Sequence, residues 1–332
     1  MTFVPFQDAN GICDRFLALL SRHNIQPRAG SSFEDELLSL TQLLEVTKNP
    51  SLVQGTQQVM LLRAAAGVHD FAAKVLSAEP LTEFAGFLPH LRLIAQTKFA
   101  AASLSQNISS AYDDDTARKM AELYMGCLAA HVGTQVELDS PTAAKGDNPD
   151  VIFTATPTVE GVDQPSEKWA LAIKTIGTSQ GQTIFERIKE GAEQIDDPKC
   201  SAHKGMVVVN AKNALDHQAL WNGPFSDLQT AMDALGNQLD SLADNANTDR
   251  PQSEWDEIFS GKVKRPVLFL GQSLVHLPTQ AGARTPTALK MLRAYGANSV
   301  LDPTAHGLAH CLNHFMQTIL LGVPGDAGRQ PC

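Results

Sequence analysis

The sequence has few cysteines, few aromatic residues and no long hydrophobic run. Its five cysteines lie far apart and form no Cys-x-x-Cys pair, which argues against a disulfide scaffold or a zinc ribbon. No apolar stretch approaches the roughly 18–20 residues of a membrane-spanning helix. The first residues also lack the basic and apolar segments of a secretory signal. We therefore expect a cytoplasmic protein without a membrane partner.

The chain also lacks an excess of positive charge. Its net charge of −10 does not suit a protein that coats nucleic acid over its whole surface. The charge is uneven, however. Basic residues outnumber acidic ones in 168–213 and 258–332, whereas acidic residues dominate 113–167 and 214–257. A local basic groove is therefore compatible with the acidic total.

The first third of the chain reads as helical. Apolar residues recur at three- and four-residue spacing, and prolines punctuate the pattern. The predicted helices cover residues 12–23, 32–46, 56–78 and 87–108, and a further helix covers 112–133. We treat residues 1–112 as a helical N-terminal region.

The hydrophobic period then changes from helical to strand-like. We predict strands at 134–138, 149–157 and 168–177, a helix at 183–195 and a buried strand at 204–213. A helical insertion follows around 214–262, with an amphipathic helix at 227–244. The chain then continues with a strand at 265–277 and two C-terminal helices, 285–296 and 302–322. Residues 113–332 therefore read as an α/β domain.

Two strands of this domain bring a carboxylate close to a lysine. The loop between them centres near Val162, which places Asp150 opposite Lys174. Alternation puts Asp150, Ala172 and Lys174 on one face of the sheet. A carboxylate can hold a hard divalent cation, Mg²⁺ or Mn²⁺, and a lysine can orient water or offset charge on a phosphate. The pair suits metal-dependent phosphodiester hydrolysis.

The order of elements and these residues resemble the PD-(D/E)xK nuclease superfamily. Pro149 and Asp150 match the first part of its motif, and Lys174 matches the lysine. The resemblance implies a restriction-endonuclease-like core of helix, three strands, helix and strand. It also implies a glutamate on the first helix, which Glu122 would supply, and cleavage of nucleic acid, with DNA expected rather than RNA.

The sequence departs from the family pattern at Ala172, where the motif has an acid. Some members of the family supply this carboxylate from the following helix. Here that helix offers Glu186, with Glu190 further along. We therefore take Lys174, Asp150, Glu122 and Glu186 as candidate catalytic residues and Asp150 and Glu186 as candidate metal ligands. Gln180 and Gln182 in the preceding loop are candidate substrate contacts.

Each of these residues also has a plainer interpretation. Lys174 could extend to solvent from the end of its strand, and Asp150 could serve as a turn residue after proline. Glu186 stands three residues after Thr183 and could complete a capping box. Glu122 could pair with Arg118 on the helix surface.

Two other functions stay open at this point. Ala172 could mark a catalytically inactive module that binds nucleic acid or a protein partner, and the helical N-terminal region is a candidate surface for that partner or for a homodimer. The sheet could also be unrelated to nucleases, with Asp150 and Lys174 forming a plain ion pair. Spacing of four residues could let His306, His310 and His314 share a metal, form a polar helix face or line a groove.

Overall fold

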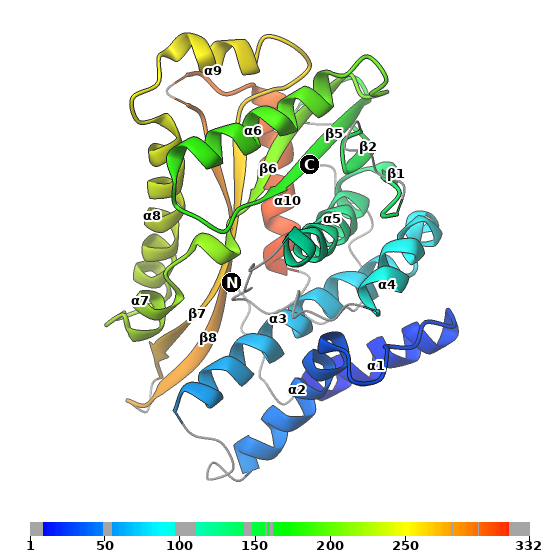
Figure 1. Ribbon diagram of the computed structural model, residues 1–332, viewed down its shortest axis with the longest axis vertical. Coiled ribbons are helices and arrows are strands. Elements are labelled where there is room, and N and C mark those ends of the chain that lie inside the picture. Colours follow the sequence, from blue (N-terminus) through cyan, green and yellow to red (C-terminus); the bar gives the residue numbers. More distant parts are fainter. Residues whose placement is uncertain are drawn as a thin grey trace.

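The computed structural model describes residues 9–48, 55–96, 111–142, 148–156, 158–159, 162–279, 282–297 and 299–318. The fold is mixed α/β, and helices cover both faces of a six-stranded sheet (Figure 1). None of the helices in these ranges is both long and apolar enough to cross a lipid bilayer.

The helical first part of the chain agrees with the sequence pattern. Its elements are α1 (Ala9–Arg22), α2 (Ser32–Lys48), α3 (Thr56–Ala78), the 3₁₀ turn η3 (Thr82–Phe87), α4 (Leu88–Ile94) and α5 (Ala111–Val132). The part of the predicted 87–108 helix beyond Gln96 lies outside the described residues. One hydrophobic core joins these helices to the sheet: Phe16 and Phe71 belong to the same buried cluster as Trp169.

The sheet has the strand order β1-β2-β5-β6-β7-β8. Its strands are β1 (Thr134–Leu138), β2 (Val151–Ala155), β5 (Glu167–Thr175), β6 (Lys204–Asn210), β7 (Val267–Pro278) and β8 (Arg284–Tyr295). The pairs β1–β2, β2–β5 and β7–β8 are antiparallel, whereas β5, β6 and β7 are parallel. Helix α6 (Gly181–Asp196) connects β5 to β6, as a parallel pair requires.

The remaining elements surround this sheet. A separate two-stranded ribbon forms from β3 (Thr158–Val159) and β4 (Val162–Asp163). After β6 come the 3₁₀ turn η4 (Lys212–Ala214) and helices α7 (His217–Asn222), α8 (Leu228–Asn247) and α9 (Gln252–Ile258), and α10 (Pro303–Thr318) follows β8. Residues 319–322 of the predicted last helix lie outside the described residues.

The two faces of β5 enter different cores. Leu171 and Ile173 pack in the cluster with α5 and α10, whereas Ala170 and Ala172 pack in the cluster with α6 and α8. This is the alternation that the sequence predicts. Gly133 at the end of α5 lies against β2, where a Cβ atom would stand 2.3 Å from the Thr154 carbonyl oxygen. The close approach fixes α5 over the first strands and so sets the position of Glu122.

One predicted helix is wrong. Of the residues predicted as the helix 285–296, those up to Tyr295 belong to the strand β8 (Arg284–Tyr295), which pairs with β7 along its whole length. Alanine, leucine, methionine, lysine and arginine favour helix locally, but pairing with a distant strand overrides this weak preference. Two side chains of α10 also bind the outer backbone of β8: the Leu292 N–H donates to Asn313 Oδ1 at 3.0 Å, and Gln317 donates to the Lys290 carbonyl.

The predicted register of the β2–β5 hairpin is also wrong, by two residues. Val151 pairs with Leu171, so continuing the ladder by one step places Asp150 beside Ala172 instead of Lys174. The reason lies in the connection, where β3 and β4 form a tighter ribbon centred before Val162. Because the shift is even, the two residues keep the same face of the sheet.

Candidate functional site

Asp150 lies immediately before β2 and is buried. The Ile173 N–H donates to Asp150 Oδ2 at 2.5 Å. Burial raises the pKa of Asp150 to about 7, and the nearby charge of Glu122 acts in the same direction, whereas Lys174 and the Ile173 N–H oppose them. Asp150 is therefore partly protonated at pH 7.

Glu122 lies on α5 and is fully buried. Lys119 Nζ donates to both Glu122 oxygens at 3.0 Å, and His90 Nε2 lies 3.0 Å from Oε2. Burial lowers the pKa of His90 to about 4, so the ring is neutral near pH 7 and Nε2–H is the donor. The predicted pair with Arg118 exists at 3.5 Å, but the carboxylate is inside the protein and not on its surface.

Lys174 is buried near the end of β5, between α5 and α6. Burial lowers its pKa, whereas the charges of Asp150 and Glu190 raise it. The cations Arg118 on α5 and Arg187 on α6 act in the same direction as burial. The lysine therefore does not extend freely to solvent, and it lies near the charged groups that the site requires.

Glu186 faces a different set of partners. Gln182 Nε2 donates to Glu186 Oε1 at 2.7 Å, and Arg250 donates to Gln182 Oε1. The predicted capping box is not formed, because α6 begins at Gly181 and the capping position is Gln180, whose side chain makes no cap hydrogen bond. Gln180 is exposed, and its amide oxygen accepts a weak 3.5 Å bond from Thr183. Asp150 thus lies near enough to Glu122 and to Lys174 for both charges to act on it, whereas Glu186 bonds to Gln182, which in turn accepts from Arg250.

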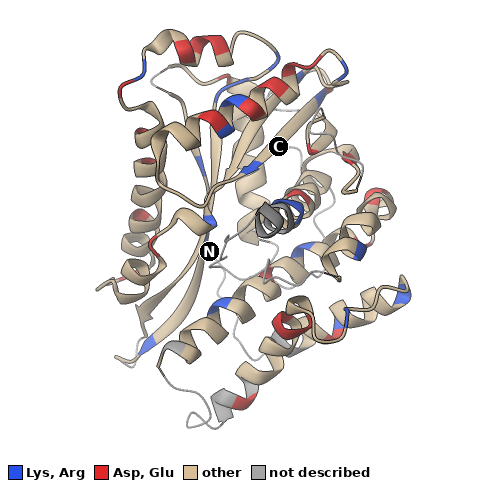
Figure 2. Cartoon of the chain, viewed as in Figure 1, with Lys and Arg blue, Asp and Glu red and all other residues tan. Residues whose placement is uncertain are grey.

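Glu190 is the carboxylate of α6 whose charge acts on Lys174. It is half-exposed and accepts from Arg187 at 3.0 Å. The next residue, Gly191, lies against the missing acid: a Cβ atom there would stand 3.4 Å from the Ala172 Cβ. Figure 2 shows charges of both signs along the outward face of α6. Glu190 is therefore the carboxylate of this helix that stands next in sequence to the residue lying against Ala172.

The oxygen donors at this site fit some, but not all, of the requirements of a hard divalent cation. Asp150 and Glu122 offer carboxylate oxygens, and a cation near Asp150 would favour its charged form, which burial and the charge of Glu122 now oppose. Glu122 is also neutralised by Lys119 and Arg118. Within the described residues, no three His, Cys, Asp or Glu side chains already stand together as a metal site. A third carboxylate would have to move in, and Glu190 is placed to do so.

The loop between β5 and α6 also matches the Gly-x-Ser-x-Gly pattern of serine hydrolases, from Gly177 to Gly181. The geometry does not follow the pattern. Ser179 is exposed, and its φ is not in the left-handed region. No histidine in the described ranges bonds to its hydroxyl, so a nucleophile activated by a base is missing.

The three histidines of the last helix point outward. His306, His310 and His314 are all exposed on α10, and no Asp, Glu or Cys joins them in a metal-binding group within the described ranges. A polar helix face describes them best. Asn313 and Gln317 have a different role, because they bind the backbone of β8.

No family model matches this chain, and its comparison with curated proteins and with solved structures gives no match.

Two residues of the site were not foreseen from sequence. Lys119 stands three residues before Glu122 on the same helix, and that spacing is a signal that could have revealed it. His90 comes from α4, 32 residues before Glu122, and no local pattern connects the two.

Proposed function

We propose that this protein is a metal-dependent nuclease with a restriction-endonuclease-like core. The observation that carries the proposal is that the buried Asp150 lies near enough to both Glu122 and Lys174, which are also buried, for their charges to act on its pKa. The order α5, β1, β2, β5, α6, β6 supports the core, because it has the expected sequence of helix, three strands, helix and strand.

The proposed roles follow from charge and burial. Asp150 and Glu122 hold the cation, which would polarise the phosphate and lower the pKa of a bound water. Lys174 is buried beside them, where an ammonium orients the attacking water or offsets charge that develops on the phosphate. The Ile173 N–H fixes one oxygen of Asp150, so the other oxygen stays available to a ligand.

The surrounding charge suits a phosphate group. Lys119, Arg118 and Lys174 supply three positive charges around Glu122 and Asp150, and Asp150 is partly protonated near pH 7. The site is therefore net positive before a cation binds, which favours an anionic substrate and weakens metal binding alone. We expect the nucleic acid and the cation to bind together, with the phosphate adding the missing negative charge.

We assign the relocated carboxylate to Glu190 in place of Glu186. Glu190 acts on Lys174, and the one side-chain contact that holds it within the described part of the chain is the exposed pair with Arg187. Such surface pairs contribute little energy, so breaking this one costs little. Gln180 and Gln182 remain proposed substrate contacts, and the bond from Arg250 to Gln182 would have to give way.

The second candidate function is a catalytically inactive module that binds nucleic acid or a protein partner. The observation that favours it is the Lys119 ammonium, which already bonds to both oxygens of Glu122. Together with Ala172 this arrangement leaves Asp150 as the one carboxylate not already paired with a cation at the site.

The test is a cleavage assay on supercoiled plasmid, single-stranded DNA and RNA with Mg²⁺ or Mn²⁺. Wild-type protein is expected to nick or cut DNA, and Lys174→Ala is expected to abolish cleavage. Lys189→Ala, on the exposed face of α6, is the matched control and should retain activity. Mn²⁺ binding, measured by titration with and without DNA, separates the two candidates. No cleavage of any substrate and no Mn²⁺ binding that depends on Asp150 would leave the binding module as the answer.

A further inference from the structure

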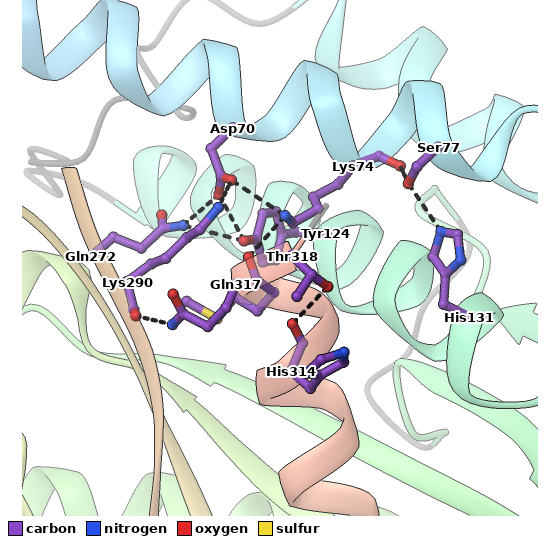
Figure 3. A network of polar contacts seen from close by, with 11 residues as sticks. Asp70, Lys74, Ser77, Tyr124, His131, Gln272, Lys290, His314, Gln317 and Thr318 are labelled. Carbon is purple, nitrogen blue, oxygen red and sulfur yellow. Dashed lines mark hydrogen bonds and ion pairs between the residues drawn. The ribbon is translucent and has the colours of Figure 1, made fainter. Parts of the chain in front are cut away.

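A second cluster of charged and polar side chains lies where α3 faces the sheet and α10 (Figure 3). Its centre is Asp70 of α3, which accepts from Tyr124 Oη at 2.7 Å and from Gln272 Nε2 at 2.9 Å. Lys290 of β8 donates to the same carboxylate, and Lys74 Nζ lies 3.5 Å away while it donates to the Met316 carbonyl at 2.9 Å. The cluster thus joins α3, α5, β7, β8 and α10.

A small cavity of about 10 Å³ lies beside this cluster. Its polar lining includes Tyr124, Gln272 and Lys212, and its apolar lining includes Phe71, Met120 and Leu270. Space of this order holds one water-sized species. It is too small for phosphate, sulfate or a carboxylate-bearing molecule.

Lys212 is the polar group of this cavity that lacks a partner. The residue is 6% exposed, and across the described residues its ammonium makes no hydrogen bond or close ion pair. Burial lowers the pKa of Lys212 to about 8, whereas the more distant charges of Glu36 and Asp70 raise it. The ammonium therefore remains mostly charged at pH 7, and a buried charge without a partner is costly.

The charges around the cavity do not balance. The carboxylates are Asp70 and Glu36, and the cations linked to them are Lys74, Lys290 and Lys212. Tyr124 stays neutral because burial raises its pKa well above the usual value. Burial lowers the pKa of Lys74 to about 7, so this lysine carries its charge only in part at pH 7, but the positive charge still exceeds the negative. The cavity therefore favours an anion over a water molecule.

We propose that this cavity binds a single monatomic anion of the halide class, chloride in the cell, held by the Lys212 ammonium. The anion supplies the counter-charge that the described side chains do not give to Lys212. Its binding is independent of the proposed nuclease site, because Glu122 faces that site from α5 whereas Tyr124 of the same helix lines the cavity.

Crystals grown without halide and soaked in sodium bromide test the proposal by anomalous scattering. We expect a bromide peak in the cavity of the wild-type protein and its loss in Lys212→Met. In solution, the thermal unfolding midpoint of the wild type should rise saturably when chloride replaces methanesulfonate at constant ionic strength. Lys212→Met should lose that dependence, and Lys199→Met, which removes an exposed lysine, should keep it.

A water molecule in the wild-type cavity with no bromide, together with equal midpoints in chloride and methanesulfonate, would overturn the proposal. If Lys212→Met does not fold, the wild-type bromide map decides alone, because a peak within contact distance of Lys212 supports the site and its absence refutes it.

Discussion

Asp150 lies inside the protein near enough to Glu122 for the glutamate charge to raise its pKa, although one residue precedes β2 and the other belongs to α5. Burial acts in the same direction, so Asp150 carries a proton for part of the time at pH 7. A cation bound to Asp150 in the proposed nuclease would displace this proton. The pair therefore connects the stability of the protein to pH and to metal.

We predict that Asp150→Asn changes how stability depends on pH. Because the pKa of Asp150 is raised from 3.8 to about 7, the folded state binds the proton more tightly than the unfolded state. The stabilisation is complete below pH 4 and is lost as the pH rises through 7. Asparagine does not ionise, so the variant lacks this pH dependence. The free energy of unfolding of the variant minus that of the wild type should therefore increase by about 1–4 kcal/mol as the pH rises from 4 to above 7.

Urea unfolding at several pH values in the presence of a chelator measures this difference. Buried histidines such as His131, whose pKa burial lowers to about 4 without a contribution from Asp150, affect both proteins equally and cancel. A difference that stays constant from pH 4 to pH 8 would show that Asp150 ionises normally.

We predict that Glu190→Gln impairs metal-dependent cleavage far more than Glu186→Gln. The two residues lie on the same helix, but Glu190 acts on Lys174 whereas Glu186 bonds to Gln182. The expected losses are about 10–100-fold for Glu190→Gln and less than about twofold for Glu186→Gln. Mn²⁺ affinity measured in the presence of DNA should follow the same order. A larger loss of cleavage and of Mn²⁺ affinity in Glu186→Gln than in Glu190→Gln would instead identify Glu186 as the carboxylate that replaces the acid missing at position 172.

We predict that Ala172→Asp increases the affinity for Mn²⁺ by about tenfold, because added carboxylate charge strengthens oxygen-ligand sites. Position 172 is the neighbour of Asp150 across the β2–β5 pair, and the absence of a side chain on Gly191 leaves limited space beside it. Without metal the variant should be destabilised by about 1–3 kcal/mol, the cost of a buried polar group.

Ala170→Asp is the control for this substitution. Ala170 is buried on the same face of β5, two residues further from Lys174. It should lose stability without gaining Mn²⁺ affinity in isothermal titration. Equal metal affinity in both variants would contradict a metal site beside Asp150.

We predict that Asp70→Asn destabilises the protein by about 3–5 kcal/mol, because it leaves the buried ammonium groups of Lys74 and Lys290 uncompensated. Asp240→Asn is the comparison, since its ion pair with Arg293, at 2.7 Å, is also close but lies at the surface. That change should cost less than about 1 kcal/mol in urea unfolding. Similar losses of unfolding free energy in the two variants would show that burial does not increase the contribution of the Asp70 ion pairs to stability.

Much of the element order could be predicted from the sequence, because it depends on local periodicity. The apolar run of β6 and the helical spacing of α6 both carry strong signals. The strand β8 carries the opposite signal, and only its pairing with β7 makes it a strand. That information lies in a contact between distant residues, and no window of sequence contains it.

The candidate site was predictable to the same extent. Spacing around a turn brought Asp150 near Lys174, but the true register depends on a short ribbon in the connection. The partners of Glu122 depend on packing between helices, and so His90 could not be foreseen. Glu186 and Glu190 belong to the same helix and differ in the direction in which their side chains point. That direction depends on how α6 is rotated about its axis where it packs on the sheet, which the sequence does not specify.

The contacts of α10 with β8 also have a consequence for assembly. The side chains of Asn313 and Gln317 make hydrogen bonds that a neighbouring strand would otherwise make. Asn313 accepts from the Leu292 N–H, and Gln317 donates to the Lys290 carbonyl. An incoming chain cannot join the sheet at this stretch without displacing the helix, which guards an edge strand against strand exchange and fibrous growth. A dimer built by extending this edge of the sheet across two copies would have to begin nearer Arg284, where Pro286 lacks an N–H to offer.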